Sequence, residues 1–301
     1  MATTAAETTT TIPGDPETAA PAPTARPLSA LRALRTLRRS RVGMVGAAIV
    51  GFWIVVAIFA PLLAPYSGYA LDVTARSLAP SLAHPFGTDN FGRDVLSRVL
   101  LGSRSVLTIA PLATLLGLVL GTLIGVTTGY LGGLYDEIMM RVIDGFMAFP
   151  TLIILLLIVS VVPPSAFVVT VIIGINFAPY SGRVVRSAVL GVRNLEYVEA
   201  AKLRGESSLA IMLREVLPNC WRPIVVEGTT RIGYAIFAEA GLSFLGLGVP
   251  APTPDWGVMV NEARSHILNA SWMAIFPSLA IASLVVGVNL LADGVKQATS
   301  S

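Results

Sequence analysis

Long, almost uncharged apolar runs constrain this sequence more than any other feature. The hydrocarbon core of a bilayer is about 30 Å thick, and about 20 residues of α-helix cross it. Five runs have about that length, which favours membrane-spanning helices over the shorter helices of a soluble core. The runs cover residues 44–64, 106–128, 144–162, 166–182 and 271–291.

A sixth apolar run, residues 224–247, is interrupted by Glu227, Arg231 and Glu239. Glu227 and Arg231 lie four positions apart, so on a helix they share one face and can form an ion pair. Hydrophobic residues make up 54% of the chain, charged residues only 13%, and the mean hydropathy is +0.73. Such a composition is far from that of a soluble domain. We therefore predict an all-α integral membrane protein with six transmembrane helices.

The segments outside these runs are assigned from composition. The first residues are rich in Thr, Ala and Pro and too poor in apolar residues to form a core. Arginines at helical spacing then precede the first run, which is typical of a helix at the membrane surface. The predicted organisation is a disordered tail at 1–28, a basic cytoplasmic or interfacial helix at 29–43, a first transmembrane helix at 44–65, an extracytoplasmic segment at 66–103, and a core transmembrane domain at 104–295 that contains a cytoplasmic loop at 191–222.

The distribution of basic residues indicates the orientation. Six spans place both chain ends on one side of the membrane, and Lys and Arg are concentrated in cytoplasmic segments of membrane proteins. With the ends inside, the inner segments hold most basic residues, including the group from Arg183 to Arg222. The outer segments hold only Arg76, Arg93, Arg98, Arg104 and Arg264. Both termini are therefore predicted to be cytoplasmic.

Two outer connections carry local structural signals. HPFGTDNFGRDVLSR, residues 84–98, has turn residues followed by a helix start at Asp94. VPAPTPDWG, residues 249–257, is stiffened by prolines, and its Trp256 belongs to a residue type that favours membrane interfaces.

Four glycines repeat every fourth residue in the second apolar run. Gly117, Gly121, Gly125 and Gly129 form overlapping GxxxG units on one helix face. Such a face lets another helix approach closely, either within this chain or in a partner.

Several kinds of chemistry lack the residues they need. The chain has only two lysines, Lys202 and Lys296, and neither follows a glycine, so a phosphate-binding GxxxxGK[ST] loop is excluded. His84 and His266 stand alone, without metal-ligand spacing. Cys220 is the single cysteine, which excludes a disulfide framework. No GxSxG motif is present, and we expect no cofactor bound by this chain and no nucleic-acid partner.

Glu239 leaves two interpretations open. A carboxyl group inside a membrane span usually faces a cavity or the bundle interior, so Glu239 is a candidate for the lining of a polar pathway. That interpretation permits an ion-coupled secondary transporter, which would transport without ATP. No internal repeat supports that class, however, and an intramembrane enzyme is the weakest alternative because no nucleophile and base are paired.

The charged stretch EYVEAAKLRGESSLAIMLREVLPNC, residues 196–220, reads as two short helices. Asn194 can cap the first helix, Glu199 can pair with Lys202, and Gly205 ends it. Ser207 or Ser208 can cap a second helix over 209–217, which Pro218 stops. Ala200 and Ala201 give the first helix a side-chain-poor face that another protein surface can approach.

Part of this stretch, EAAKLRGESSLAIMLREVLP, resembles the EAA loop of ABC importer permeases. HPFGTDNFGRDVLSR, VIDGFMAFP, AEAGLSFLGLG and PTPDWG narrow the resemblance to the second permease subunit of the dipeptide/oligopeptide (and nickel) importers. The resemblance covers roughly residues 30–295. Glu206, Glu215 and the C-terminal NLLADGVKQATSS depart from the family pattern.

The resemblance implies a type I ABC importer (MetI-like) permease fold in a bacterial inner membrane, carrying dipeptides, oligopeptides or, alternatively, nickel or another solute. It implies a homologous second permease, two ABC ATPase subunits or domains that bind ATP and Mg, and an extracytoplasmic substrate-binding protein as partners within the lipid bilayer. The chain would then be a transport subunit and not an enzyme. The residues implied in coupling to the ATPases are Glu199, Ala200, Ala201, Lys202, Gly205, Leu217 and Pro218.

Overall fold

The computed structural model describes residues 40–300, and these residues form helices joined by turns and loops. The tail predicted at 1–28 and nearly all of the helix predicted at 29–43 lie outside the described residues. The α-helices are α2 Arg41–Leu63, α3 Val95–Leu131, α4 Gly133–Met147, α5 Thr151–Val161, α6 Ala166–Val192, α7 Glu196–Leu203, α8 Ser208–Ile211, α9 Trp221–Phe244, α10 Trp256–Ala263 and α11 Trp272–Ser300. Short 3-10 segments lie at Val73–Ala75, Leu217–Asn219 and Arg264–His266, and a π-helical turn at Met212–Val216.

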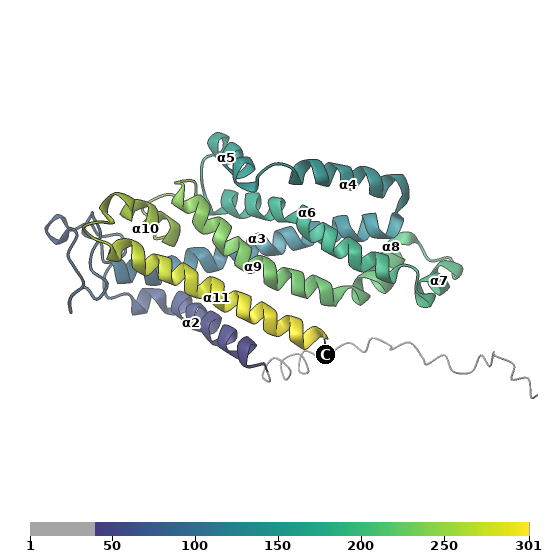
Figure 1. Ribbon diagram of the computed structural model, residues 1–301, viewed down its shortest axis with the longest axis horizontal. Helices are drawn as coiled ribbons and strands as arrows, with labels where there is room; N and C mark the ends of the chain where they lie inside the picture. The colour runs from purple at the N-terminus through teal and green to yellow at the C-terminus, as the bar shows by residue number, and fades with distance from the viewer. Residues whose placement is uncertain (1–39, 301) are drawn as a thin grey trace, which may run out of the picture.

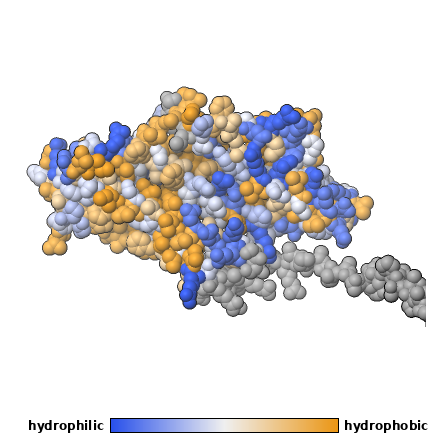
Figure 2. All heavy atoms as spheres, viewed as in Figure 1, coloured by the Kyte–Doolittle hydropathy of each residue, from blue (hydrophilic) through white to orange (hydrophobic). Residues whose placement is uncertain are grey.

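The long helices run side by side along one axis (Figure 1). Four of them, α2, α3, α6 and α11, are long and apolar enough to cross a membrane. Helix α7 lies at one end of the bundle, and α10 lies at the other with the loop that precedes α3. We call these the α7 end and the α10 end. On the face shown in Figure 2, hydrophobic residues gather over the middle of the bundle and hydrophilic residues over the α7 end.

Helix α3 begins where the sequence predicted and packs closely on α6. Asp94 caps it, because the Asp94 Oδ2 atom accepts a 2.8 Å hydrogen bond from the backbone N–H of Ser97. The four repeated glycines face α6: a Cβ atom on Gly121 would lie 2.6 Å from Ser181 Cβ and 2.8 Å from the carbonyl oxygen of Ala178. The two backbones are therefore in direct contact along this face.

Helix α2 is fastened to α11. A Cβ atom on Gly46 would lie 2.4 Å from the backbone nitrogen of Leu291, so glycine is needed for the two helices to approach. The Trp53 indole N–H donates a 2.9 Å hydrogen bond to Ser283 Oγ. Near the ends of the same two helices, Ser40 Oγ donates to Gln297 Oε1 at 3.0 Å. The beginning and end of the described chain thus lie together.

Two apolar runs differ from the pattern of the other four. The run 144–162 is not one helix: α4 ends at Met147 and α5 begins at Thr151, because Pro150 lacks an N–H and disfavours helical geometry in the residue before it. Helix α5 has 11 residues and spans only about 16 Å. Helix α9 is continuous over 24 residues but contains charged side chains, and the six-helix count is not established by length and composition alone.

Candidate functional site

The α7 segment has well-defined ends. Helix α7 ends as predicted at Gly205, whose φ of +77° lies in the left-handed region that side chains disfavour. The N–H of Gly205 bonds to the Lys202 carbonyl and the N–H of Glu206 to the Ala201 carbonyl, which together form a Schellman motif. The predicted cap at its start is wrong: Leu195 holds the N-cap position, and no side chain caps the helix.

One face of α7 is anchored in the bundle. Val198 and Ala201 are fully buried, in a cluster with Val185 and Val189 of α6. Ile211, Met212, Val216 and Cys220, from the segment that follows α7, complete the cluster. This apolar cluster holds the buried face of α7 against the end of the bundle.

The opposite face of α7 is exposed. Glu199, Ala200, Lys202 and Gly205 lie at the surface. The two alanines of the motif thus have different surroundings, since Ala200 is exposed whereas Ala201 is part of the buried cluster. The side-chain-poor surface predicted for both residues is formed by Ala200 and Gly205.

The charges around this surface are paired differently from the sequence prediction. Among the described residues no ion pair joins Glu199 to Lys202, and the Lys202 ammonium lies 5.8 Å from the centroid of the Tyr130 ring. Arg204 instead pairs with the two residues that depart from the family pattern, at 2.7 Å from Glu206 and 3.8 Å from Glu215. Both glutamates therefore help to hold the turn between α7 and α8.

The second helix is shorter and less regular than predicted. Ser207 caps α8, accepting a 3.3 Å hydrogen bond from the N–H of Ala210, and the chain then passes through the π-helical and 3-10 turns. Leu217 is half-buried against the anchoring cluster, whereas Pro218 is exposed. These two residues begin the 3-10 turn that leads into α9.

Exposed leucines at the α7 end were missed by the sequence reasoning. Leu203 is 89% exposed, and Leu209 and Leu213 are also exposed beside the α7 turn. Three large apolar side chains in a highly charged segment indicate a contact surface. Their position between charged residues could have predicted this surface, because a leucine exposed to solvent does not stabilise a helix that makes no further contact.

Cys220 lies beneath this surface. Its side chain is buried, and burial raises the pKa of the Cys220 thiol to about 11. The thiol therefore stays protonated at neutral pH and acts as a small apolar group in the anchoring cluster.

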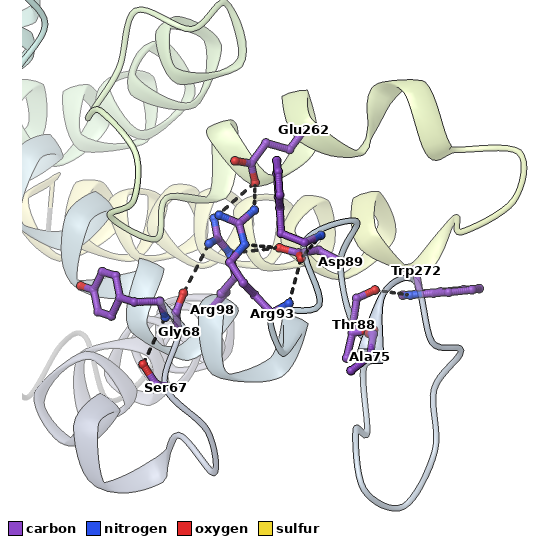
Figure 3. A network of polar contacts seen from close by, with 11 residues as sticks. Ser67, Gly68, Ala75, Thr88, Asp89, Arg93, Arg98, Glu262 and Trp272 are labelled. Atoms are coloured by element: carbon purple, nitrogen blue, oxygen red, sulfur yellow. Dashed lines mark hydrogen bonds and ion pairs between the residues drawn. The ribbon is translucent and has the colours of Figure 1, made fainter. Parts of the chain in front are cut away.

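The α10 end holds a polar network (Figure 3). Arg93 is bound on two sides, because its Nε donates to Asp89 at 2.6 Å and its Nη2 donates to Glu262 of α10 at 2.6 Å. Arg98, which is almost fully buried, donates to the Gly68 carbonyl and to Glu262, each at 3.4 Å. The network ties the loop before α3, the start of α3 and α10 into one unit.

Trp256 is not at an interface, as the sequence suggested, but in the core of the α10 end. It is fully buried, its indole N–H donates a 2.8 Å hydrogen bond to the Val99 carbonyl, and its ring packs edge-on against Trp53. The helix α10 that it begins has no apolar periodicity long enough to be detected from the sequence.

The charged residues inside α9 lie at different depths, because Glu227 and Glu239 are buried and Arg231 is half-buried. The predicted ion pair is confirmed, with Arg231 Nε 2.6 Å from Glu227 Oε1. The Arg231 guanidinium also lies over the rings of Phe177, Tyr180 and Tyr234. Glu239 is fully buried, as is Asp255, which immediately precedes α10. Within residues 40–300, no group of three or more His, Cys, Asp and Glu side chains is arranged to hold a metal ion.

Comparison with known proteins places the chain in a family. Residues 117–300 match the family model described as binding-protein-dependent transport system inner membrane component. Residues 30–80 match the N-terminal TM domain of oligopeptide transport permease C. The fold of a chain of the MetNI methionine ABC transporter, in an inward-facing conformation, aligns with 69% of this chain and 97% of that chain, with a TM-score of 0.57 and 18% identity.

Two curated relatives match nearly the whole chain. The dipeptide transport system permease protein DppC of Alkalihalophilus pseudofirmus is 38% identical over 260 residues, which cover 86% of each chain. The glutathione transport system permease protein GsiD of Escherichia coli is 40% identical over 261 residues, again covering 86% of each chain. The chain therefore belongs to the binding-protein-dependent transport system inner membrane components, as a permease subunit of an ABC importer with the MetI-like fold.

Proposed function

We propose that this permease carries peptides and forms half of a pathway shared with a homologous second permease. The substrate class is supported by the relatives named for dipeptide and glutathione transport. The heterodimer is supported by apolar side chains that the single chain leaves exposed, among them Ile153 and Val161 on α5 and Phe237 on α9. Nickel and other solutes are the alternatives that a transport assay must exclude.

The proposed membrane arrangement has six crossings, made by α2, α3, the broken α4–α5 pair, α6, α9 and α11. Helix α9 is about 36 Å long, and Glu227 and Arg231 neutralise each other within it. The hydrogen bond between Ser40 and Gln297 supports termini on one side. The basic residues of the α7 end support a cytoplasmic position for that side and both termini, and the membership of the family supports a bacterial inner membrane.

We infer that the α7 end docks on one of two partner ATPases, which bind ATP and Mg and hydrolyse the ATP. The observation that carries this inference is the two-sided form of α7, buried through Val198 and Ala201 and exposed through Ala200, Leu203 and Gly205. The exposed face of such a helix would fit a cleft on the ATPase. Its buried face would pass the motion of the ATPase to α6 and α9. A substrate-binding protein would deliver the peptide at the α10 end.

Reversal of an exposed charge tests this docking. Glu199→Arg should leave the permease in the membrane, lower the amount of ATPase that co-purifies with it, and uncouple ATP hydrolysis from peptide uptake, since opposite charge now meets the partner cleft. Glu137→Arg is the comparison variant, because it makes the same charge reversal at an exposed carboxylate of α4, outside the α7 segment. Normal coupling in the Glu199 variant would contradict the proposed site.

The other residue roles are tested separately. Uptake of labelled dipeptides, longer peptides and nickel by cells with and without the gene distinguishes the substrate classes. If Glu239 lines the pathway, its substitution should change the substrate preference and not only the rate of uptake. Transport by the purified chain alone, driven by an ion gradient without ATPase subunits, would instead support a secondary transporter.

A further inference from the structure

Two acidic side chains meet in the interior of the α10 end. Glu239 lies near the end of α9, and Asp255 immediately precedes α10. Both residues are 0% exposed, and they are neighbours, because α9 and α10 are in direct contact beside them at Ala240 and Gly257. Two neighbouring carboxylates excluded from water cannot both be ionised without a cation, because their repulsion adds to the cost of burying each charge.

No basic side chain among the described residues pairs with either acid. The helices packed around them, α2, α6 and α11, have no charged residue in the parts of the sequence that lie in this half of the bundle. Helix α3 contributes Arg98 and Arg104, and α10 contributes Glu262. Arg98 is engaged by Glu262 and Asp89, and Arg104 forms no ion pair in the described part of the chain.

The hydrogen-bond donors distinguish the two acids. Asp255 caps α10, and its Oδ1 accepts a 3.1 Å hydrogen bond from the N–H of Val258, while its Oδ2 accepts a 3.3 Å bond from Ser105 Oγ. Glu239 Oε1 accepts only a long bond, 3.4 Å, from Ser243 Oγ. Within residues 40–300, Glu239 Oε2 faces no donor. The surroundings of Asp255 therefore stabilise a negative charge, and those of Glu239 do not.

We propose that Glu239 is a neutral carboxylic acid that donates a hydrogen bond from Oε2 to Asp255, so that the two groups share one proton and one negative charge. The proton turns the orphaned Glu239 oxygen into a donor with an acceptor beside it. It also removes the need for a cation beside two acids that no basic side chain of the described residues pairs with. Glu239 is then a positioning residue, because it joins α9 to the capping residue of α10.

The backbones of α9 and α10 around Glu239 and Asp255 are packed too tightly for the two helices to separate freely. A Cβ atom on Gly257 of α10 would lie 2.4 Å from the Ala240 carbonyl oxygen, and one on Gly248 would lie 1.9 Å from Ser243 Oγ. Helix α10 carries Glu262, which binds both arginines of the polar network. Through Asp255, the proton on Glu239 thus helps to fix the whole α10 end on α9.

Infrared spectroscopy of the purified full-length permease in its importer complex tests the proton directly. The wild type should show the C=O band of a protonated carboxylic acid at neutral pH, and Glu239→Gln should lack this band. Glu227→Gln is the matched control, because Glu227 is a buried α9 acid paired with Arg231, and its removal should leave the band in place. Asp255→Asn should keep the band but shift its frequency, since the acceptor of the hydrogen bond has changed.

Thermal stability supplies the second readout. A glutamine amide can donate to Asp255 as the acid does, so Glu239→Gln should retain the melting temperature, whereas Glu239→Ala should lower it. Equal bands in the wild type and Glu239→Gln would overturn the proposal, as would a sodium-dependent melting temperature that points to a cation between two ionised acids. The spectrum does not depend on transport, so its failure is distinct from a failure of the proposed function.

Discussion

The charged side chains at the two ends of the bundle differ in burial. At the α10 end, Arg93 and Arg98 are buried and bind carboxylates of the same chain. At the α7 end, Arg204 is 56% exposed where it pairs with Glu206, and Leu203 is 89% exposed beside it. The α10 end thus pairs its buried arginines within the chain, whereas the α7 end leaves polar and apolar side chains exposed at its surface.

The largest effect is expected from breaking the network of the α10 end. Arg93→Met leaves Asp89 and Glu262 without their closest cation, and loss of one partner of a buried ion pair costs about 3 kcal/mol or more. The melting temperature of the purified protein should fall clearly. Arg141→Met, which removes an exposed ion pair with Glu137, should cost less than about 1 kcal/mol. Equal decreases in melting temperature in the two variants would contradict the difference in stability between buried and exposed ion pairs.

A smaller effect is expected at the turn after α7. Gly205→Ala forces a side chain into the left-handed region at a cost of about 1 kcal/mol, and no steric clash adds to it because no atom lies within 4 Å of the new Cβ position. Gly191→Ala, near the end of α6, is the control: its Cβ position is equally open and its φ is negative, so it should be neutral or slightly stabilising. Thermal unfolding of the two variants measures the difference.

The exposed leucine should matter for binding and not for folding. Leu203→Ser should change the unfolding free energy by no more than about 0.5 kcal/mol, because the side chain makes few contacts within the chain. It should still lower the amount of ATPase recovered with the permease. Leu82→Ser makes the same change at a fully exposed residue near the α10 end and should lower neither quantity.

The smallest perturbation is chemical labelling of the cluster beneath the α7 surface. The pKa of the Cys220 thiol is raised from 9.0 to about 11, so between these pH values the unfolded protein forms a reactive thiolate and the folded protein does not. Iodoacetamide should therefore modify Cys220 only after denaturation. In a Cys220→Ala background, Leu203→Cys should react without denaturation. Rapid modification of native Cys220 would show that the anchoring cluster is open.

The sequence was sufficient for features that depend on local or periodic patterns. The long apolar runs, the Asp94 cap, the Gly205 turn and the Glu227–Arg231 pair all follow from residues close together in the chain. The docking role of the α7 end stays a prediction that came from the resemblance to the EAA loop, whose spacing from Glu199 to Gly205 is contained within one helix and its turn.

Features that depend on distant contacts were missed. The sequence did not show that Ala201 faces α6 while Ala200 faces outward, because this depends on the direction in which α7 leaves the bundle. Trp256 was assigned to an interface from its residue type. The assignment was wrong because Trp256 is buried against Trp53, and this contact joins residues far apart in the chain. The contact of Glu239 with Asp255 and that of Arg93 with Glu262 have the same long-range origin.

Site-specific photo-crosslinking of the assembled importer tests the central claim most directly. A photoreactive amino acid at position 203, at the α7 end, should crosslink to an ATPase subunit, and the same amino acid at position 82, near the α10 end, should not. Both positions are exposed in this chain, so accessibility alone does not decide the outcome. A crosslink from position 82 to the ATPase, or none from position 203 in an importer that still takes up substrate, would contradict the assignment of the α7 end as the docking surface.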